Sequence, residues 1–101
     1  LLHRGKLSLD ISRLTIQWDG QLVALTVTEF WMAHALAKFP GHVKSRQVLM
    51  QESKIFVDGS TITSHVKRIR KKFMLIDKEF DCIETVYGMG YRWNITPEVT
   101  A

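Results

Sequence analysis

The chain has 101 residues, of which 46% are hydrophobic and 24% are charged, and its formal net charge is +4. This length is enough for one domain with a modest core, and the hydrophobic content argues against general disorder. No apolar run approaches the ~20 residues of a membrane-spanning helix, and the single cysteine, Cys82, excludes an internal disulfide and fits a reducing compartment.

We interpret residues 1–6 as the end of a linker, because no apolar h-region follows them as it would in a signal peptide. The chain begins at Leu1 rather than Met, so we expect a domain cut from a longer protein. We expect residues 7–96 to form that domain and residues 97–101 to be a frayed tail.

The N-terminal part is predicted to be a small antiparallel sheet. Two stretches alternate apolar and polar residues, as half-buried strands do. Their apolar positions are Leu7, Leu9 and Ile11, then Leu14, Ile16 and Trp18. Asp19-Gly20 is a strong two-residue hairpin signal and leads into a further strand over residues 21–25. No catalytic constellation occurs here, which favours a scaffold role.

A helix is predicted after this sheet. Thr26 and Glu29 have the spacing of a capping box, in which each side chain accepts a hydrogen bond from the backbone amide of the other residue. The helix continues to Ala37, and Pro40-Gly41 ends it. His34 has no second ligand four residues away, so we interpret it as a core or interface residue rather than a metal ligand.

Ser45 is the predicted N-cap of a second, short helix over residues 46–52. Residues 53–57 then connect it to the next helix. Their apolar side chains fit either packing within a loop or a surface for a partner.

Residues 58–73 are predicted to form an amphipathic helix. Its apolar stripe recurs at gaps of four, three and four residues and consists of Ile62, Val66, Ile69 and Phe73. The opposite side has small hydroxyl residues near its N-terminus and long cations further on. These are Ser60, Ser64, Lys67, Arg68 and Lys71, flanked by Thr61 and Thr63.

The formal charge excess of the chain lies in this one helix. Residues 58–73 hold five cations and one acid, a net of +4, which equals the net charge of the whole chain. A helix that enters a DNA major groove needs this layout, because short side chains approach base edges and cations reach phosphates. A solvated cationic face, with lysines near the helix C-terminus where the dipole favours them, is equally compatible with the helix alone.

Residues 83–93 are predicted to form a β-hairpin whose tip needs Gly88 and Gly90. This Gly-x-Gly is not a dinucleotide fingerprint, because it joins two strands and opens no helix. Nearby acids lack a nucleophile or metal-ligand spacing, so we expect no enzyme, no cofactor and no metal. The order of sheet, three helices and hairpin predicts an α+β fold, a winged helix-turn-helix with the hairpin as its wing.

The chain resembles the C-terminal effector domain of OmpR/PhoB-type bacterial response regulators. The resemblance rests on residues 25–30, 40–46, 64–73 and 83–93, and residues 80–91 resemble the ChvI-type branch. It implies a two-component transcriptional regulator in the cytoplasm, at the bacterial nucleoid. It also implies an N-terminal receiver domain phosphorylated by a sensor histidine kinase, dimers on directly repeated half-sites of double-stranded DNA, and contact with RNA polymerase.

The resemblance also implies residue roles. The side chains expected to face bases are Thr61, Thr63, Ser64, Lys67 and Arg68. Those expected at phosphates are Arg46, Arg70, Lys71 and Tyr91. The wing tip consists of Tyr87, Gly88 and Gly90 and would touch the minor groove or its phosphates. His65 would either pack in the core or contact a phosphate, and its position at the edge of the apolar stripe favours packing.

The chain departs from the family pattern at three places. Ser60 stands where an Arg is frequent, and Tyr87 stands where many members have an Arg that enters the minor groove. Residues 53–57 form a shorter loop without the common Trp.

Two other functional classes are also compatible with the sequence. A winged helix that serves as a protein-interaction module would expose Ile55 and Phe56 as its partner surface. A membrane-surface amphipathic helix would also use Lys and Arg, but its apolar stripe would have to leave the core.

Overall fold

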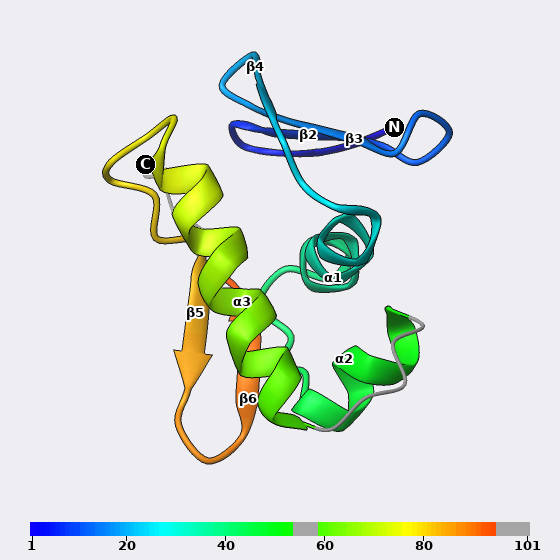
Figure 1. Cartoon of the computed structure of the whole chain (residues 1–101), viewed down its shortest axis with the longest axis vertical. Coiled ribbons are helices and arrows are strands. Elements are labelled where there is room, and N and C mark those ends of the chain that lie inside the picture. The colour runs from blue at the N-terminus through cyan, green and yellow to red at the C-terminus, as the bar shows by residue number, and fades with distance from the viewer. Residues whose placement is uncertain (54–58, 95–101) are drawn as a thin grey trace.

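The computed structural model describes residues 1–53 and 59–94 (Figure 1). An N-terminal antiparallel sheet, of order β1-β2-β3-β4, lies above three helices, and a two-stranded hairpin follows. The strands of the first sheet are β1 (Leu2–Arg4), β2 (Leu7–Asp10), β3 (Thr15–Trp18) and β4 (Gln21–Val23). The helices are α1 (Val27–Lys38), α2 (Arg46–Glu52) and α3 (Gly59–Met74), and the hairpin strands are β5 (Ile83–Val86) and β6 (Gly90–Trp93). This arrangement confirms the predicted winged helix.

The sheet buries the apolar positions that the alternation predicted within its strands. Leu7 pairs with Trp18 and Leu9 with Ile16, so these four side chains point to one face and are buried. Ile11 and Leu14 do not continue the pattern, because β2 ends at Asp10. The Asp10 carboxylate accepts hydrogen bonds from the backbone amides of Ser12 and Arg13, which form a turn. The alternation was therefore extended too far into this turn.

The expected linker at residues 1–6 contains strand β1. Leu2 pairs with Leu9 across β2, which places residues 2–4 at the edge of the sheet. Arg4 also donates hydrogen bonds to the carbonyl oxygens of Ala37 and Lys38, at 3.1 Å each. These carbonyls lie at the C-terminal end of α1, where no intrahelical donor is left for them. The start of the chain is thus tied both to the sheet and to α1.

The predicted helix caps are present. Thr26 and Glu29 form both hydrogen bonds of the capping box, and the Ser45 hydroxyl accepts from the Val48 amide at 3.1 Å. Helix α3 contains the predicted apolar stripe, and all four of its side chains are buried. Asp58, where this helix was predicted to begin, lies outside the described residues.

An aromatic cluster joins the sheet, the end of α3 and the wing. Phe73 stacks on Phe80 with a centroid distance of 4.4 Å, and Trp18 meets Phe80 edge-on at 5.0 Å. The indole N–H of Trp18 donates to Asp77 at 2.9 Å, just beyond the helix C-terminus. Trp93 of β6 completes the cluster. These contacts fix α3 relative to both sheets.

The wing is anchored to the chain that precedes α2. Lys44 and Tyr91 exchange two backbone hydrogen bonds of 2.7 and 2.9 Å, so residue 44 pairs with β6 as a short third strand would. Gly90 has φ +135°, and a Cβ built on it would lie 2.1 Å from the Lys44 carbonyl oxygen. Gly88 has φ +80° and open space around it. The prediction that this tip requires glycines is explained by close approach at Gly90 and by backbone conformation at Gly88.

Within the described parts of the chain, no helix has the length and apolar content to cross a membrane.

Candidate nucleic-acid interface

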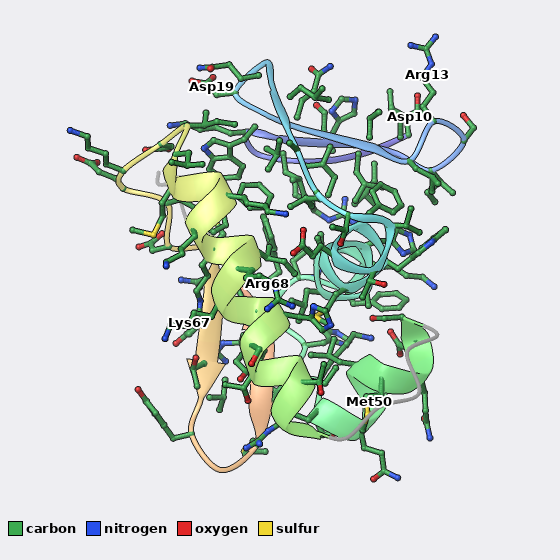
Figure 2. All side chains as sticks on the ribbon, viewed as in Figure 1. Asp10, Arg13, Asp19, Met50, Lys67 and Arg68 are labelled. Carbon is green, nitrogen blue, oxygen red and sulfur yellow. The ribbon has the colours of Figure 1, made fainter. Side chains whose placement is uncertain are left out.

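Helix α3 lies across the front of the helical layer, with α2 near its N-terminal end and the wing alongside (Figure 1). Its buried stripe divides the remaining surface into three strips: an edge facing α1, an edge facing the wing, and an outer strip. Figure 2 shows Arg68 reaching from α3 toward α1, while Lys67 leaves the helix on the other side. The three strips differ in how many hydrogen bonds and ion pairs their polar side chains make with other parts of the chain.

The edge facing the wing holds Arg70. Its Nε and Nη2 donate to the Ile83 carbonyl oxygen at 3.1 and 2.8 Å, and Nη2 also donates to Thr85 Oγ1 at 2.7 Å. The guanidinium lies 5.9 Å from the centroid of the Tyr91 ring, and the buried Tyr91 donates its hydroxyl hydrogen to Thr63 at 3.4 Å. Arg70 and Tyr91 therefore hold the wing against α3, and their phosphate contacts stay a prediction.

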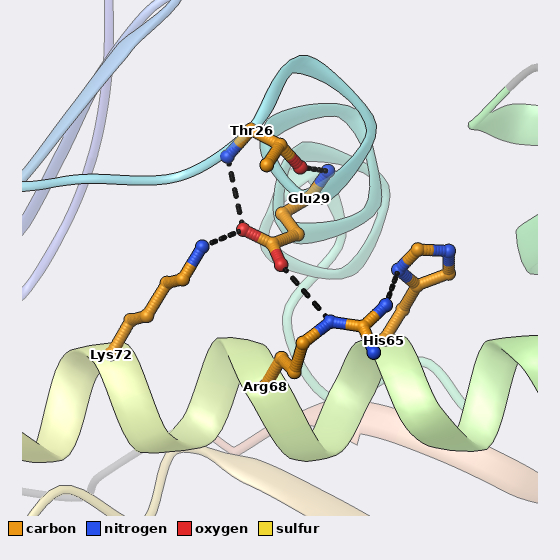
Figure 3. Close-up of polar contacts among 5 residues, drawn as sticks. All are labelled: Thr26, Glu29, His65, Arg68 and Lys72. Carbon is orange, nitrogen blue, oxygen red and sulfur yellow. Dashed lines mark hydrogen bonds and ion pairs between the residues drawn. The ribbon is translucent and has the colours of Figure 1, made fainter.

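The edge facing α1 is organised by one buried carboxylate, that of Glu29 (Figure 3). Glu29 is 2% exposed, and its Oε1 accepts from the Thr26 amide at 2.9 Å and from Lys72 Nζ at 2.6 Å. Its Oε2 lies 3.6 Å from Arg68 Nε. Burial raises the pKa of Glu29, but the hydrogen bonds from Lys72 and Thr26 and the charge of Lys72 outweigh burial, so the pKa lies below its usual value.

Arg68 also contacts His65, one helical turn earlier. Arg68 Nη2 lies 2.8 Å from His65 Nδ1. Arginine only donates, so Nδ1 must be the unprotonated acceptor nitrogen. Burial, helped by the positive charge of Arg68, lowers the pKa of His65 and favours this neutral form. His65 is half-buried, and its bond to Arg68 is a contact that the helical wheel did not reveal.

The outer strip consists of Ser64, Lys67 and Lys71, which are all exposed. Among the described residues, no carboxylate lies within ion-pairing distance of Lys67 or Lys71. Thr63 is exposed beside this strip, and Thr61 is half-buried. Of the predicted base-facing side chains, four are exposed and one, Thr61, is only partly accessible; the exposed ones are Thr63, Ser64, Lys67 and Arg68.

Two further predicted contacts flank this surface. Arg46 is exposed in the first turn of α2. Tyr87 is 91% exposed at the wing tip, next to Gly88, and the exposed Met89 follows. The side chain of Ser60, and Ile55 and Phe56 of the connecting loop, lie outside the described residues.

Two side chains that could in principle ligate a metal, His34 and Glu84, have structural partners. His34 stacks against the Phe30 ring and meets the Trp31 ring edge-on. Glu84 accepts a hydrogen bond from Arg92 at 2.9 Å across the wing. No group of three His, Cys, Asp or Glu side chains close enough to share a metal ion occurs among residues 1–53 and 59–94.

Comparison with known proteins agrees with this geometry. The sequence profile of the family described as "Transcriptional regulatory protein, C terminal" matches residues 20–93. The chain belongs to this family. It is a winged-helix domain of the OmpR/PhoB type of response regulators, whereas the narrower ChvI-type assignment stays a prediction.

Relatives and solved structures support the assignment. The chain is 38% identical over 90 residues to the transcriptional regulatory protein BaeR of Escherichia coli, covering 86% of this chain and 38% of BaeR. The DNA-binding domain of the response regulator AdeR, solved in complex with an intercistronic region, superposes with a TM-score of 0.82 at 26% identity, covering 94% of this chain and 98% of that one. The Klebsiella pneumoniae RstA DNA-binding domain, solved with the RstA box, gives 0.79 at 28% identity, covering 94% and 97%. The chain spans less than half the length of the curated relative.

Proposed function

We propose that this domain binds double-stranded DNA sequence-specifically, as the effector domain of a bacterial two-component transcriptional regulator. Helix α3 would enter the major groove, and the wing would reach the minor groove or its backbone. The observation that carries the proposal is the outer strip of α3, where Lys67 and Lys71 are exposed and have no carboxylate partner among the described residues. The AdeR and RstA domains, which share this fold, were solved with DNA.

We assign different tasks to different side chains, as the resemblance to the family implies. Bases would be read from Thr61, Thr63, Ser64, Lys67 and Arg68, and phosphates would be bound by Arg46, Lys71, Arg70 and Tyr91. Phosphate contacts should dominate affinity and make it salt-dependent, whereas the few base contacts should set the sequence. One such module buries roughly 600–1,000 Å² of its surface on DNA, so binding by the isolated domain should be weak.

The rest of the proposal concerns the whole protein. A receiver domain before Leu1 would be phosphorylated through a sensor histidine kinase, and this would promote dimers on directly repeated half-sites. The regulator would work at the nucleoid in the cytoplasm and would contact RNA polymerase. Family membership supports these partners.

The test begins with a duplex that the domain itself selects from a randomised pool. Wild-type domain should bind this selected duplex more tightly than random DNA, and the affinity should fall steeply with salt. Lys71→Ala should weaken binding to both duplexes and reduce the log–log salt slope by about one unit. Lys78→Ala, at an exposed lysine in the turn after α3, is the matched control and should change neither.

Absence of any duplex binding at low salt would refute the proposal. In that case a protein-interaction module would be the function to pursue. An unchanged slope for Lys71→Ala would remove Lys71 from the phosphate contacts while leaving DNA binding itself intact.

A further inference from the structure

We propose that Glu29, on α1, is a positioning residue for sequence readout: its buried carboxylate orients Arg68 of α3 for contact with a base. The inference rests on the proposed function, since it concerns how that function becomes selective. Sequence reasoning gave Glu29 only a role in the capping box, and the structure adds the contacts to α3 (Figure 3).

The carboxylate is a rigid anchor. Glu29 is 2% exposed, and its own backbone amide and that of Thr26 are both tied into the capping box. Oε1 is held by Thr26 and Lys72, which leaves Oε2 directed at Arg68. Because α1 packs into the core through Phe30, Ala33 and Leu36, this oxygen has a fixed place relative to α3.

The two cations on Glu29 do different things. Lys72 Nζ lies at 2.6 Å, a short charge-assisted hydrogen bond that neutralises the carboxylate. Arg68 Nε lies at 3.6 Å, and the Arg68 side chain is 51% exposed, so this contact is longer and more screened by water. The carboxylate therefore orients Arg68 but leaves its side chain accessible for another contact.

This orientation leaves N–H groups at the terminal end of the Arg68 guanidinium available for a base. Glu29 takes the Nε side and His65 Nδ1 takes one hydrogen of Nη2, so Nη1 and the second hydrogen of Nη2 remain. Two terminal N–H groups suffice for an end-on bidentate contact with guanine O6 and N7. An arginine without such partners would have to be ordered on binding, and the lost conformational entropy would weaken each complex in which it contacts a base. Holding Arg68 beforehand reduces that cost.

The decisive variant is Glu29→Gln. Glutamine also fits the third position of a capping box, so the hydrogen bond to the Thr26 amide can persist while the charge is lost. We expect the ratio of the affinity for the selected duplex to the affinity for random duplex to fall about 3- to 10-fold. This fall corresponds to the free-energy cost of ordering one side chain on binding. Thr26→Ala is the matched control: it removes the hydroxyl cap but keeps the carboxylate, and it should leave the ratio unchanged.

A double-mutant cycle separates positioning from a general loss of structure. If Glu29 acts through Arg68, then Glu29→Gln should not lower the ratio further in an Arg68→Ala background. Should Glu29→Gln fail to fold because it leaves the Lys72 ammonium without a partner, the pair Glu29→Gln with Lys72→Met removes both charges. It is then compared with Lys72→Met alone, which retains the contact between Glu29 and Arg68.

An unchanged ratio in Glu29→Gln, with wild-type domain still selecting its duplex, would overturn this inference alone. If Glu29→Gln lowered the affinity ratio in the Arg68→Ala background as much as in wild type, the inference would also be overturned. Glu29 would then act on the structure in general and not through Arg68. Failure of wild-type domain to prefer any duplex would overturn the proposed function, and this inference with it.

Discussion

Gly90 offers a severe test of how the wing is attached. A Cβ at this position would lie 2.1 Å from the Lys44 carbonyl oxygen and 2.8 Å from both the Lys44 carbonyl carbon and Ser45 Cα. All three are backbone atoms, so no flexible side chain can move aside. Gly90→Ala must therefore push β6 away from residue 44, which breaks or lengthens the two hydrogen bonds between Lys44 and Tyr91.

The magnitude follows from two contributions. An alanine forced to a positive φ costs about 1–2 kcal/mol. Two weakened backbone hydrogen bonds cost about 0.5–1.5 kcal/mol each. We therefore expect Gly90→Ala to lower the free energy of unfolding by roughly 2–5 kcal/mol. Gly88→Ala is the matched control, because Gly88 also has a positive φ but no atom within 4 Å of its added Cβ.

Urea unfolding followed by circular dichroism measures both variants. Gly88→Ala should lose only the conformational part, about 1–2 kcal/mol, so Gly90→Ala should be the less stable of the two by at least about 1 kcal/mol. Equal destabilisation would refute the argument, since it would mean that the close approach to Lys44 contributes nothing. Greater destabilisation by Gly88→Ala would contradict it outright.

Three further predictions concern α3. Arg68→Ala should weaken binding to the selected duplex by about 1–3 kcal/mol and relax base choice at one position; an equal loss on random DNA would make Arg68 a phosphate contact. Arg70→Met should lower the free energy of unfolding by about 1–3 kcal/mol, because the Ile83 carbonyl and the Thr85 hydroxyl lose their donor, and a salt slope shallower by about one unit would in addition verify its phosphate contact. Because the pKa of His65 is lowered by folding, its stabilising contribution is present above the ordinary histidine value of ~6.5 and is lost as pH falls through the folded value. The difference in melting temperature between wild type and His65→Gln should therefore shrink from pH 7.5 toward pH 5, and a constant difference would contradict the linkage.

Local chemistry explains which elements could be predicted from the sequence. The capping box at Thr26 and Glu29, the N-cap at Ser45, the apolar stripe of α3 and the positive φ of Gly88 each depend on residues a few positions apart. Such signals specify where a helix or turn begins, because the partners are neighbours in the chain. They failed at Ile11 and Leu14, where a turn interrupts the alternation of apolar and polar residues. They also failed at β1, which is a strand because it pairs with β2 and not because of its own sequence pattern.

The sequence by itself determined that a basic, amphipathic helix precedes a hairpin in a winged helix, and it placed every cation of that helix. It could not show which groups on other elements these cations contact, because a helical wheel gives the direction of a side chain on an isolated helix and not what packs against it. Only the tertiary structure showed that Arg70 is hydrogen-bonded to the wing and that Lys72 and Arg68 share the carboxylate of Glu29. The reason is distance along the chain: Glu29 and Lys72 are 43 residues apart, so no local pattern links a carboxylate on α1 to the arginine that we expect to read DNA.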